Sequence, residues 1–354
     1  MSELLTSPDD EVVIERDGAL VILRLNRPKA LNSLTLGMVR ALSAALDRFE
    51  KDDTVCALLL EGAGERGLCA GGDIRVIYDS GKAGTDEAAM FWREEYRLDA
   101  RIARYPKPYI SVIDGITMGG GVGVSIHARY RIVTERTKFA MPEVGIGFMP
   151  DIGGTWFLSR TPDQLGLYLG LTANTVGAGD VMAAGLAELF VPTADLAALK
   201  TKLAAVKAES EVKDALFAFA KEPPASVIAA NRALIARAFA NEKVEDILKV
   251  LDEDGSPFAQ ETAKAMRSRS PTSLKLARRM LVLGKASASL EECLVREYWA
   301  VTGLLSGHDF YEGVRAAVID KDRNPRWSPA TLADVDDATI EALIKPNKHP
   351  ALTL

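Results

Sequence analysis

The stretch of sequence that decides the fold runs from residue 107 to residue 154 and reads KPYISVIDGITMGGGVGVSIHARYRIVTERTKFAMPEVGIGFMPDIGG. Residues 109–113 form an apolar run that ends at a turn-forming Asp-Gly pair, and this pattern predicts a buried strand. A run of glycines then leads into residues 122–128, which are predicted to form a helix. Glycines let a backbone approach a ligand closely, and the first turn of a helix has N–H groups without helical acceptors. The stretch therefore predicts a loop that binds an anion.

Two acids stand out among the small and apolar residues that follow this loop. Glu143 comes directly after a Met-Pro pair, and Asp151 comes after a second one. N–H donors for a developing negative charge next to two carboxylates are typical of an active site. Glu143 could instead be an acid favoured at the start of a helix, and Asp151 could cap a helix over residues 153–158. The scarcity of other charges around Glu143 favours the catalytic interpretation.

A second glycine-rich loop, GAGERGLCAGGDIRVIYDSG, spans residues 62–81 and leads into a helix predicted over residues 73–78. Its likeness to the first loop matters because an oxyanion is stabilised by two converging N–H donors. Further along, Glu95 lies on the apolar face of a helix predicted over residues 85–104. A buried carboxylate needs a partner, so Glu95 is either a paired structural acid or part of the site.

The N-terminal part of the chain predicts a layered α/β unit. Residues 12–16 and 19–25 alternate apolar and polar side chains around an Asp-Gly pair, which is a strong hairpin signal. Thr35 is the predicted cap of a helix, and residues 54–60 are a predicted buried strand. This β-β-α order recurs with variations through the glycine-rich stretch.

The chain becomes increasingly helical after Asp151. Thr193 is a predicted helix cap, and Ser289 with Glu292 matches a capping box. The helices predicted here cover residues 194–207, 211–221, 224–240 and 271–284, with two more after residues 289 and 309. We therefore predict an α/β core over residues 11–205 and a helical C-terminal region over residues 206–354.

Composition limits the classes of partner. A net charge of −6 and a pI near 5.4 give no reason to expect nucleic acid. The three cysteines lack metal-binding spacing, and three histidines leave few candidates for a metal site. No run is long and apolar enough to span a bilayer, and the first residues show neither a signal-peptide nor a transit pattern. We therefore expect a cytoplasmic protein.

Four motifs together resemble the crotonase, or enoyl-CoA hydratase/isomerase, superfamily. They are NRPKALNSL (26–34), LCAGGDI (68–74), DGITMGGGVGVSI (114–126) and FAMPEVGIGFMPDIGG (139–154). FWREEY (91–96), the Pro-Asp-Ile-Gly-Gly run and the tail EGVRAAVIDKDRNPRW (312–327) resemble the 3-hydroxyisobutyryl-CoA hydrolase branch. The ordered set is specific where a single glycine loop is not.

The resemblance implies a crotonase-like α/β core, a superhelix of repeated β-β-α units, with a helical C-terminal region. It implies that the N–H groups of Gly72 and Gly120 form an oxyanion hole for a thioester carbonyl. Glu143 would be the main catalytic carboxylate, and Asp151 would assist it or hold the substrate's hydroxyl. The further substrate contacts that it implies are Glu95, Ala70, Asp73 and Ile74, with coenzyme A along residues 24–30 and 68–74.

The activity that the resemblance implies is hydrolysis of a short 3-hydroxyacyl-CoA thioester, with 3-hydroxyisobutyryl-CoA of valine breakdown as the favoured substrate. Hydratases of the superfamily usually have a second glutamate where this chain has Gly123, so addition of water to a double bond is poorly supported. Hydrolysis needs an oxyanion hole and one carboxylate that activates water or attacks the thioester. The alternatives are an enoyl-CoA hydratase/isomerase and a CoA-binding protein without turnover.

No cofactor is expected, because coenzyme A is part of the substrate. The expected partner is a small-molecule acyl-CoA, with neither nucleic acid nor a membrane, and the family is compatible with a homo-oligomer.

Overall fold

The computed structural model describes residues 3–354 as two units, each assembled from separate stretches of the chain. The first unit contains the described residues up to Gly72 together with Arg97–Phe139 and Val176–Ser226. The second unit contains Asp73–Tyr96, Ala140–Thr175 and Val227–Leu354. Units defined by packing need not coincide with domains, so the division at residue 205 stays a prediction.

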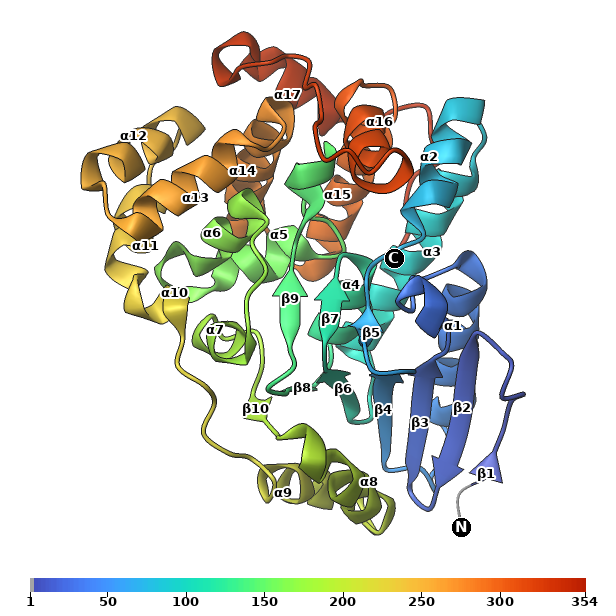
Figure 1. Ribbon diagram of the computed structural model, residues 1–354. Coiled ribbons are helices and arrows are strands. Elements are labelled where there is room, and N and C mark those ends of the chain that lie inside the picture. The colour runs from blue at the N-terminus through green and yellow to red at the C-terminus, as the bar shows by residue number, and fades with distance from the viewer. Residues whose placement is uncertain (1–2) are drawn as a thin grey trace. The chain divides into compact units, whose positions relative to one another are not determined.

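The first unit is built on two sheets. The larger sheet has the strand order β1-β2-β3-β4-β6-β8-β10, and the smaller one has the order β5-β7-β9. Strands β2 and β3 pair as an antiparallel hairpin, and the strands from β3 to β10 of the larger sheet run parallel (Figure 1). The strands are β1 Glu3–Leu4, β2 Val12–Asp17, β3 Leu20–Leu25, β4 Ala57–Gly62, β5 Gly67–Cys69, β6 Tyr109–Ile113, β7 Ile116–Met118, β8 Tyr130–Val133, β9 Lys138–Ala140 and β10 Leu189–Phe190.

Helices cover the sheet because parallel strands need apolar packing on both faces. The helices of the first unit are α1 Leu36–Glu50, α4 Gly120–Ile126, α7 Ala178–Ala183, α8 Leu196–Ala204 and α9 Val212–Phe217. On one face, α8 and α9 insert Leu199, Leu203 and Leu216 against a row of buried strand residues that includes Leu59 and Ile110. This packing buries one face of the larger sheet.

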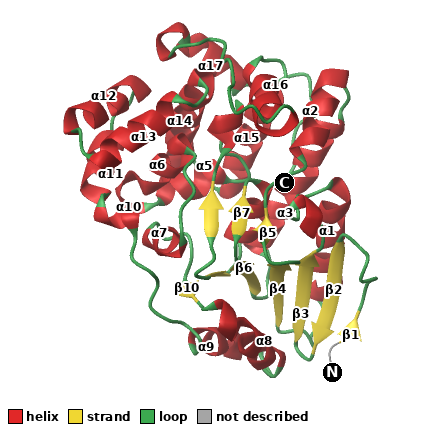
Figure 2. Ribbon diagram, in the orientation of Figure 1, coloured by secondary structure: helices red, strands yellow, loops and turns green. Residues whose placement is uncertain are grey.

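The second unit is mainly helical. Figure 2 draws the chain from Val227 to Leu354 as helices joined by loops. Helix α3, Glu87–Arg104, begins in the second unit and ends in the first. The other helices of the second unit are α2 Ile74–Ala83, α5 Gly154–Phe157, α6 Leu165–Thr172, α10 Val227–Ala230, α11 Arg232–Phe239, α12 Val244–Asp254, α13 Pro257–Arg267, α14 Pro271–Ala286, α15 Leu290–Leu304, α16 Asp309–Val314 and α17 Asp337–Leu343.

Several local predictions are confirmed. The buried strand at residues 109–113 is β6, and the hairpin around Gly18 is formed by β2 and β3. Thr35 caps α1, because its Oγ1 accepts a hydrogen bond from the Met38 N–H at 3.1 Å. The Ser289 hydroxyl likewise accepts from the Glu292 N–H at the start of α15. Capping side chains are local signals, which explains why sequence alone identifies them.

Other boundaries were predicted wrongly. The helix expected at residues 122–128 begins earlier, at Gly120, because Gly119 adopts a positive φ and its carbonyl accepts from the Val122 and Gly123 N–H groups. Thr193 does not cap a helix with its side chain, and α8 begins only at Leu196. The helix expected at residues 224–240 is interrupted between α10 and α11 at Asn231. The side-chain amide of Asn231 donates a hydrogen bond to the Val227 carbonyl. The strand expected at residues 54–60 is β4, which begins at Ala57.

Within the described residues, no helix combines the length and the apolar composition needed to cross a membrane.

Helix α4 should tolerate no side chain at Gly121. A Cβ there would lie 2.3 Å from the Cys69 carbonyl oxygen, which is far inside van der Waals contact. We expect Gly121→Ala to push α4 away from the Leu68–Gly72 loop and to cost about 1–3 kcal/mol of unfolding free energy. Urea unfolding checks this.

Gly37→Ala is the matched control, because Gly37 lies in α1 and a Cβ there meets only ordinary contacts at 3.5 Å. This change should stabilise the protein by up to about 1 kcal/mol. Equal effects of the two alanines would show that packing against Cys69 is not what selects glycine.

Candidate active site

The three predicted acids are buried together in the second unit. Glu95 lies on α3, Glu143 begins the short 3-10 helix η2 (Glu143–Ile146), and Asp151 lies on the turn before α5. Their exposed fractions are 2%, 4% and 5%, respectively. The charge of Asp151 acts on both glutamates, so the three carboxyl groups form one electrostatic cluster.

The turn that carries Glu143 is closed at both ends. Pro142 precedes it, Gly147 follows with a positive φ, and the Phe148 N–H donates to the Glu143 carbonyl oxygen at 3.0 Å. Glu143 Oε2 is buried and finds no hydrogen-bond partner among residues 3–354. Buried polar atoms normally have partners, so this oxygen is available to water or to a bound substrate.

Asp151 accepts a hydrogen bond from the buried Tyr96 hydroxyl at 2.6 Å. Its turn is unusual, because Ile152 has a φ of 55° and Gly153 has a φ of 79°. A β-branched residue rarely adopts a positive φ, and such a conformation costs about 1–3 kcal/mol unless the surroundings hold it. The alternative that Asp151 caps the helix over residues 153–158 is wrong, because its side chain is bound to Tyr96.

The N–H groups at the start of α5 are bound instead by Glu297, a residue of α15 that sequence reasoning missed. Glu297 is fully buried, and its carboxylate accepts from the Gly153 N–H at 2.7 Å and the Thr155 N–H at 2.8 Å. The Thr155 hydroxyl donates to it as well. One signal could have found Glu297: it lies on the apolar stripe of α15 between Leu294 and Val301, as Glu95 does on α3.

Burial controls the ionisation of these acids. It raises the pKa of Asp151 to about 7, although the bond from Tyr96 acts in the opposite direction. Burial, reinforced by the charge of Asp151, raises the pKa of Glu143 and of Glu95 well above that of an ordinary glutamate. Asp151 therefore ionises first, and Glu143 with Asp151 holds one proton between them near neutral pH.

Glu95 does not behave as a simple paired structural acid. Its Oε1 is buried and has no hydrogen-bond partner in the described part of the chain. Burying such an atom is unfavourable, and sites of this kind are enriched where a ligand binds. Glu95 therefore remains a candidate for a substrate contact.

The glycine loops lie in the first unit, and the structure brings them together there. A Cβ placed on Gly71 would lie 3.7 Å from the Gly120 nitrogen, so the two loops approach backbone to backbone. Gly120 is the first residue of α4, and its N–H has no acceptor within the helix. The Ala70 N–H, in contrast, donates to the Leu31 carbonyl, so Ala70 can contact a ligand only through its other atoms.

The remaining predicted contacts lie at the start of α2 and on β3. Asp73 precedes α2 without capping it through its side chain, and Ile74 is the first residue of that helix. Arg24, within the stretch expected to bind coenzyme A, is paired with Glu61 at 2.8 Å and Glu15 at 3.2 Å. Its charge is thus already neutralised. No group of three His, Cys, Asp or Glu side chains in residues 3–354 is arranged to hold a metal ion.

Comparison with known proteins gives the family. The family model for enoyl-CoA hydratase/isomerase matches residues 20–344. The chain belongs to the enoyl-CoA hydratase/isomerase family. The resemblance inferred from the four motifs is confirmed, and so is the α/β fold with a helical C-terminal region.

Relatives within this family cover nearly the whole chain. The mitochondrial 3-hydroxyisobutyryl-CoA hydrolase of Xenopus laevis is 44% identical over 95% of this chain and 89% of its own length, and that of Homo sapiens is 42% identical over 95% and 88%. A crystal structure described as a carnitinyl-CoA dehydratase from Mycobacterium thermoresistibile is 46% identical with a TM-score of 0.92, covering 98% of this chain and 99% of that one. An enoyl-CoA hydratase from Rhodobacter sphaeroides is 38% identical with a TM-score of 0.89, covering 98% and 100%.

The expectation of a cytoplasmic protein is wrong. The hydrolases named above are described as mitochondrial. Composition and the lack of a long apolar run describe how a chain behaves in water. A compartment is specified by signals that receptors recognise, so these global properties could not predict it.

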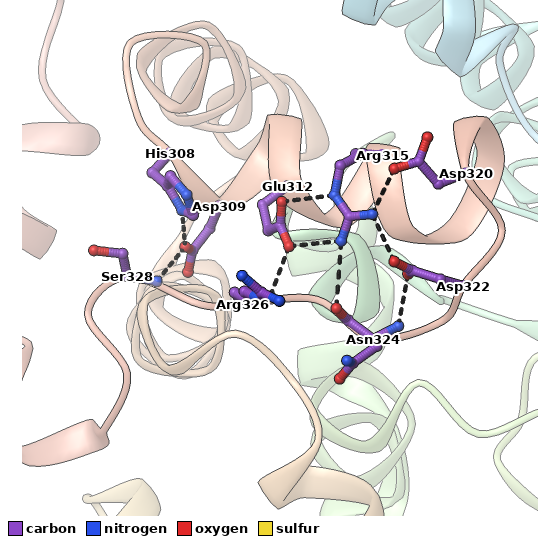
Figure 3. A network of polar contacts seen from close by, with 9 residues as sticks. All are labelled: His308, Asp309, Glu312, Arg315, Asp320, Asp322, Asn324, Arg326 and Ser328. Atoms are coloured by element: carbon purple, nitrogen blue, oxygen red, sulfur yellow. Dashed lines mark hydrogen bonds and ion pairs between the residues drawn. The ribbon is translucent and has the colours of Figure 1, made fainter.

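The tail motif of this family member supports the Glu143 turn through a cluster of charges around Arg315, shown in Figure 3. The Arg315 guanidinium forms two hydrogen bonds with Glu312 at 2.8 and 2.9 Å, and it binds Asp320 and Asp322 at 2.7 Å each. The Arg326 N–H donates to the same Glu312 carboxylate. We call Arg315 and its partners the tail cluster. It folds the chain after α16 back onto that helix.

Helix α16 in turn packs directly on η2. A Cβ on Gly313 would lie 2.2 Å from the Ile146 carbonyl carbon, and one on Gly147 would lie 2.0 Å from the Asp309 carbonyl oxygen. Asp309 also accepts from the Ser270 hydroxyl at 2.6 Å, and the Ser270 N–H donates to the Val144 carbonyl. The tail cluster is therefore linked to the Glu143 turn through backbone contacts.

Removing the buried charge should make the protein more stable at high pH. Because the pKa of Asp151 is about 7 when folded and 3.8 in its ordinary state, its stabilising protonation is complete below the lower value and lost as pH rises through the higher one. The advantage of Asp151→Asn over the wild type should grow by about 3 kcal/mol between pH 5 and pH 8.5. Urea unfolding at both pH values measures it.

Asp254→Asn supplies a control that should not respond to pH in this range. Ser256 lowers the pKa of Asp254, so its carboxylate is ionised in the folded and the unfolded protein at both pH values, and the stability difference between this variant and the wild type should be the same at pH 5 and pH 8.5. If Asp151→Asn instead lost stability on going to pH 8.5, Asp151 would not carry a raised pKa.

Breaking the tail cluster should loosen the chain after α16. Wild-type protein should resist trypsin at Lys321 and Arg323, which are exposed but have their backbone held in a left-handed conformation. In Arg315→Ala, cleavage at these residues should be roughly tenfold faster or more, because local unfolding lets their backbone adopt the extended conformation that a protease binds. Mass spectrometry of the fragments identifies the sites.

The control is Arg237→Ala, which removes an exposed ion pair with Asp254. Exposed pairs contribute little, so this variant should be cleaved as slowly as the wild type. Unchanged cleavage in Arg315→Ala would mean that the tail is held without Arg315.

Proposed function

We propose that this protein hydrolyses 3-hydroxyisobutyryl-CoA to 3-hydroxyisobutyrate and coenzyme A, a step of valine breakdown. The observation that carries the proposal is the pair of buried carboxyl groups of Glu143 and Asp151, whose pKa values burial raises. Relatives named as 3-hydroxyisobutyryl-CoA hydrolases support the substrate, since they are 41–44% identical over 94–95% of the chain.

The first role in this proposal belongs to the glycine loops. The N–H groups of Gly72 and Gly120 would donate to the thioester oxygen as it becomes negative. Preorganised donors of this kind stabilise a transition state by about 3 kcal/mol each. Coenzyme A would be held by Ala70, Asp73 and Ile74.

The second role belongs to the acids, and the proton balance defines it. In the resting pair the shared proton would lie on Glu143, and in the reactive form it would lie on Asp151. Glu143, then a carboxylate, would take a proton from the water that attacks the thioester carbon, and Asp151 would give its proton to the departing sulfur of coenzyme A. One water is consumed, the C–S bond breaks, and the pair again holds one proton. Glu95 would bind the hydroxyl of the acyl group through its unpartnered oxygen.

An enoyl-CoA hydratase is the second candidate, because two similar crystal structures are described as a hydratase and a dehydratase. Addition of water to a double bond uses two acids that flank the water. The position where hydratases of the superfamily usually have the second glutamate is Gly123, a buried glycine of α4. This residue favours hydrolysis.

Replacing the proposed base should abolish turnover without unfolding the protein. Glu143→Gln keeps the size of the side chain but cannot accept a proton from water. Release of free thiol from 3-hydroxyisobutyryl-CoA should fall by at least about 10²-fold. A thiol-reactive dye measures the rate, and Glu261→Gln, which changes an exposed acid of α13, should leave it unchanged.

Crotonyl-CoA separates the alternatives. Loss of its ultraviolet absorbance without release of thiol would favour a hydratase. Binding of coenzyme A without reaction on any acyl thioester would identify a binding protein. Either result would replace the proposed activity.

A further inference from the structure

We propose that Glu297 is a positioning residue of this site: it holds the strained turn of Asp151 and places a fixed negative charge beside that carboxyl group. This inference rests on the proposed function for its kinetic meaning. Its structural basis is independent of the substrate.

The position of Glu297 is the first argument. It comes from α15, 144 positions after Gly153 and 142 after Thr155, the two residues whose N–H groups it binds. Both amides follow Ile152, whose left-handed backbone an isoleucine does not adopt by preference. Because Glu297 accepts hydrogen bonds from the Gly153 and Thr155 N–H groups, it fixes the backbone on the C-terminal side of Ile152. Asp151, on the N-terminal side of Ile152, is thereby directed toward Tyr96.

The form of Glu297 is the second argument. Its two oxygens accept from three donors, the Gly153 N–H, the Thr155 N–H and the Thr155 hydroxyl. A carboxylate offers acceptors only, so three donors directed at it favour the ionised form. Burial raises the pKa of Glu297 to about 7, and the three donors oppose that rise.

The charge of Glu297 is the third argument, because it acts on its neighbours. It raises the pKa of Asp151 and of Tyr96, and it raises the pKa of the Cys293 thiol one helical turn away on α15. Arg296 opposes it weakly from the same helix. The titratable groups that face Asp151 or Glu297 from the surrounding elements are Glu95 and Tyr96 on α3, Glu143 on η2, and Cys293 and Arg296 on α15.

Two substitutions of Glu297 separate the effect of its side-chain length from the effect of its charge. Glu297→Gln keeps the length but removes the charge, and it turns an NH₂ group toward an N–H donor. Glu297→Asp keeps the charge but is too short to reach both amides. If Glu297 had only a structural role, both substitutions would lower the stability of the protein without changing the pKa of Asp151.

The decisive measurement is the titration of the Asp151 side-chain carbon by NMR, assigned by its loss in Asp151→Asn. In Glu297→Gln its midpoint should fall by about one unit, because a neighbouring negative charge is gone. In Glu297→Asp the midpoint should stay near the wild-type value. The control Glu292→Gln, an acid on the same helix whose side chain is 48% exposed, should not change it.

Kinetics supply the second readout. The kcat for thiol release should fall about 10–100-fold in both Glu297 variants with a smaller change in KM, since a misdirected Asp151 affects the reacting atoms. In the pH profile of kcat/KM, activity should fall at acidic pH as the pair of Glu143 and Asp151 gains its second proton. This fall should move to lower pH in Glu297→Gln and stay in place in Glu297→Asp.

An unchanged Asp151 midpoint in Glu297→Gln would overturn the inference, and so would unchanged kcat in both variants. If Glu297→Gln does not fold, Thr155→Val tests the same contact by removing one donor, and Thr155→Ser should restore the wild-type rate. The NMR titration needs no substrate. A wild type that releases no thiol would therefore refute the proposed function while the inference about Glu297 is still decided.

Discussion

The hydrogen bond from the Tyr96 hydroxyl to Asp151 decides which buried acid ionises first. Without that donor, three carboxyl groups out of contact with water would all retain their protons near neutral pH. With it, Asp151 can become an anion, and its charge then keeps Glu143 and Glu95 protonated. The pair of Glu143 and Asp151 therefore holds one proton at a site shielded from water, which is what an acid–base reaction at neutral pH requires.

The second unit contains two charge clusters with opposite effects on stability. Around Asp151, burial raises the pKa values, so ionisation opposes folding. In the tail cluster, Arg315 lowers the pKa of Glu312 to about 2, so ionisation favours folding. Aromatic packing of Phe148 between Trp92 and Phe310, each at 5.6 Å, adds apolar contact next to η2. The buried carboxyl groups around Asp151 lower stability when they ionise, and the tail cluster and the aromatic packing beside η2 stabilise the same unit.

Sequence reasoning succeeded where the signal was local. A bounded apolar run predicted β6, and the Thr35 hydroxyl predicted the start of α1. Glu143 and Asp151 stood out because charges are scarce in their loops, and the structure shows both of them buried.

It failed where the deciding contact is distant in the chain. The start of α4 depends on the backbone of Gly119, and the helix packs so closely on Cys69 that only a glycine fits at residue 121. Glu297 binds an amide 144 residues away, and no local pattern announces that contact. Helices α12 and α13 were not predicted either, although their amphipathic patterns are clear once their boundaries are known.

The tail cluster also bears on the order in which the protein is made. Residues after Arg315 are synthesised later than the acids and the glycine loops, yet they help to fix α16 against the turn of Glu143. A nascent chain on the ribosome therefore carries its acids and its glycine loops long before the turn is held in place. The contacts that hold the Glu143 turn are therefore complete only after the tail cluster has formed.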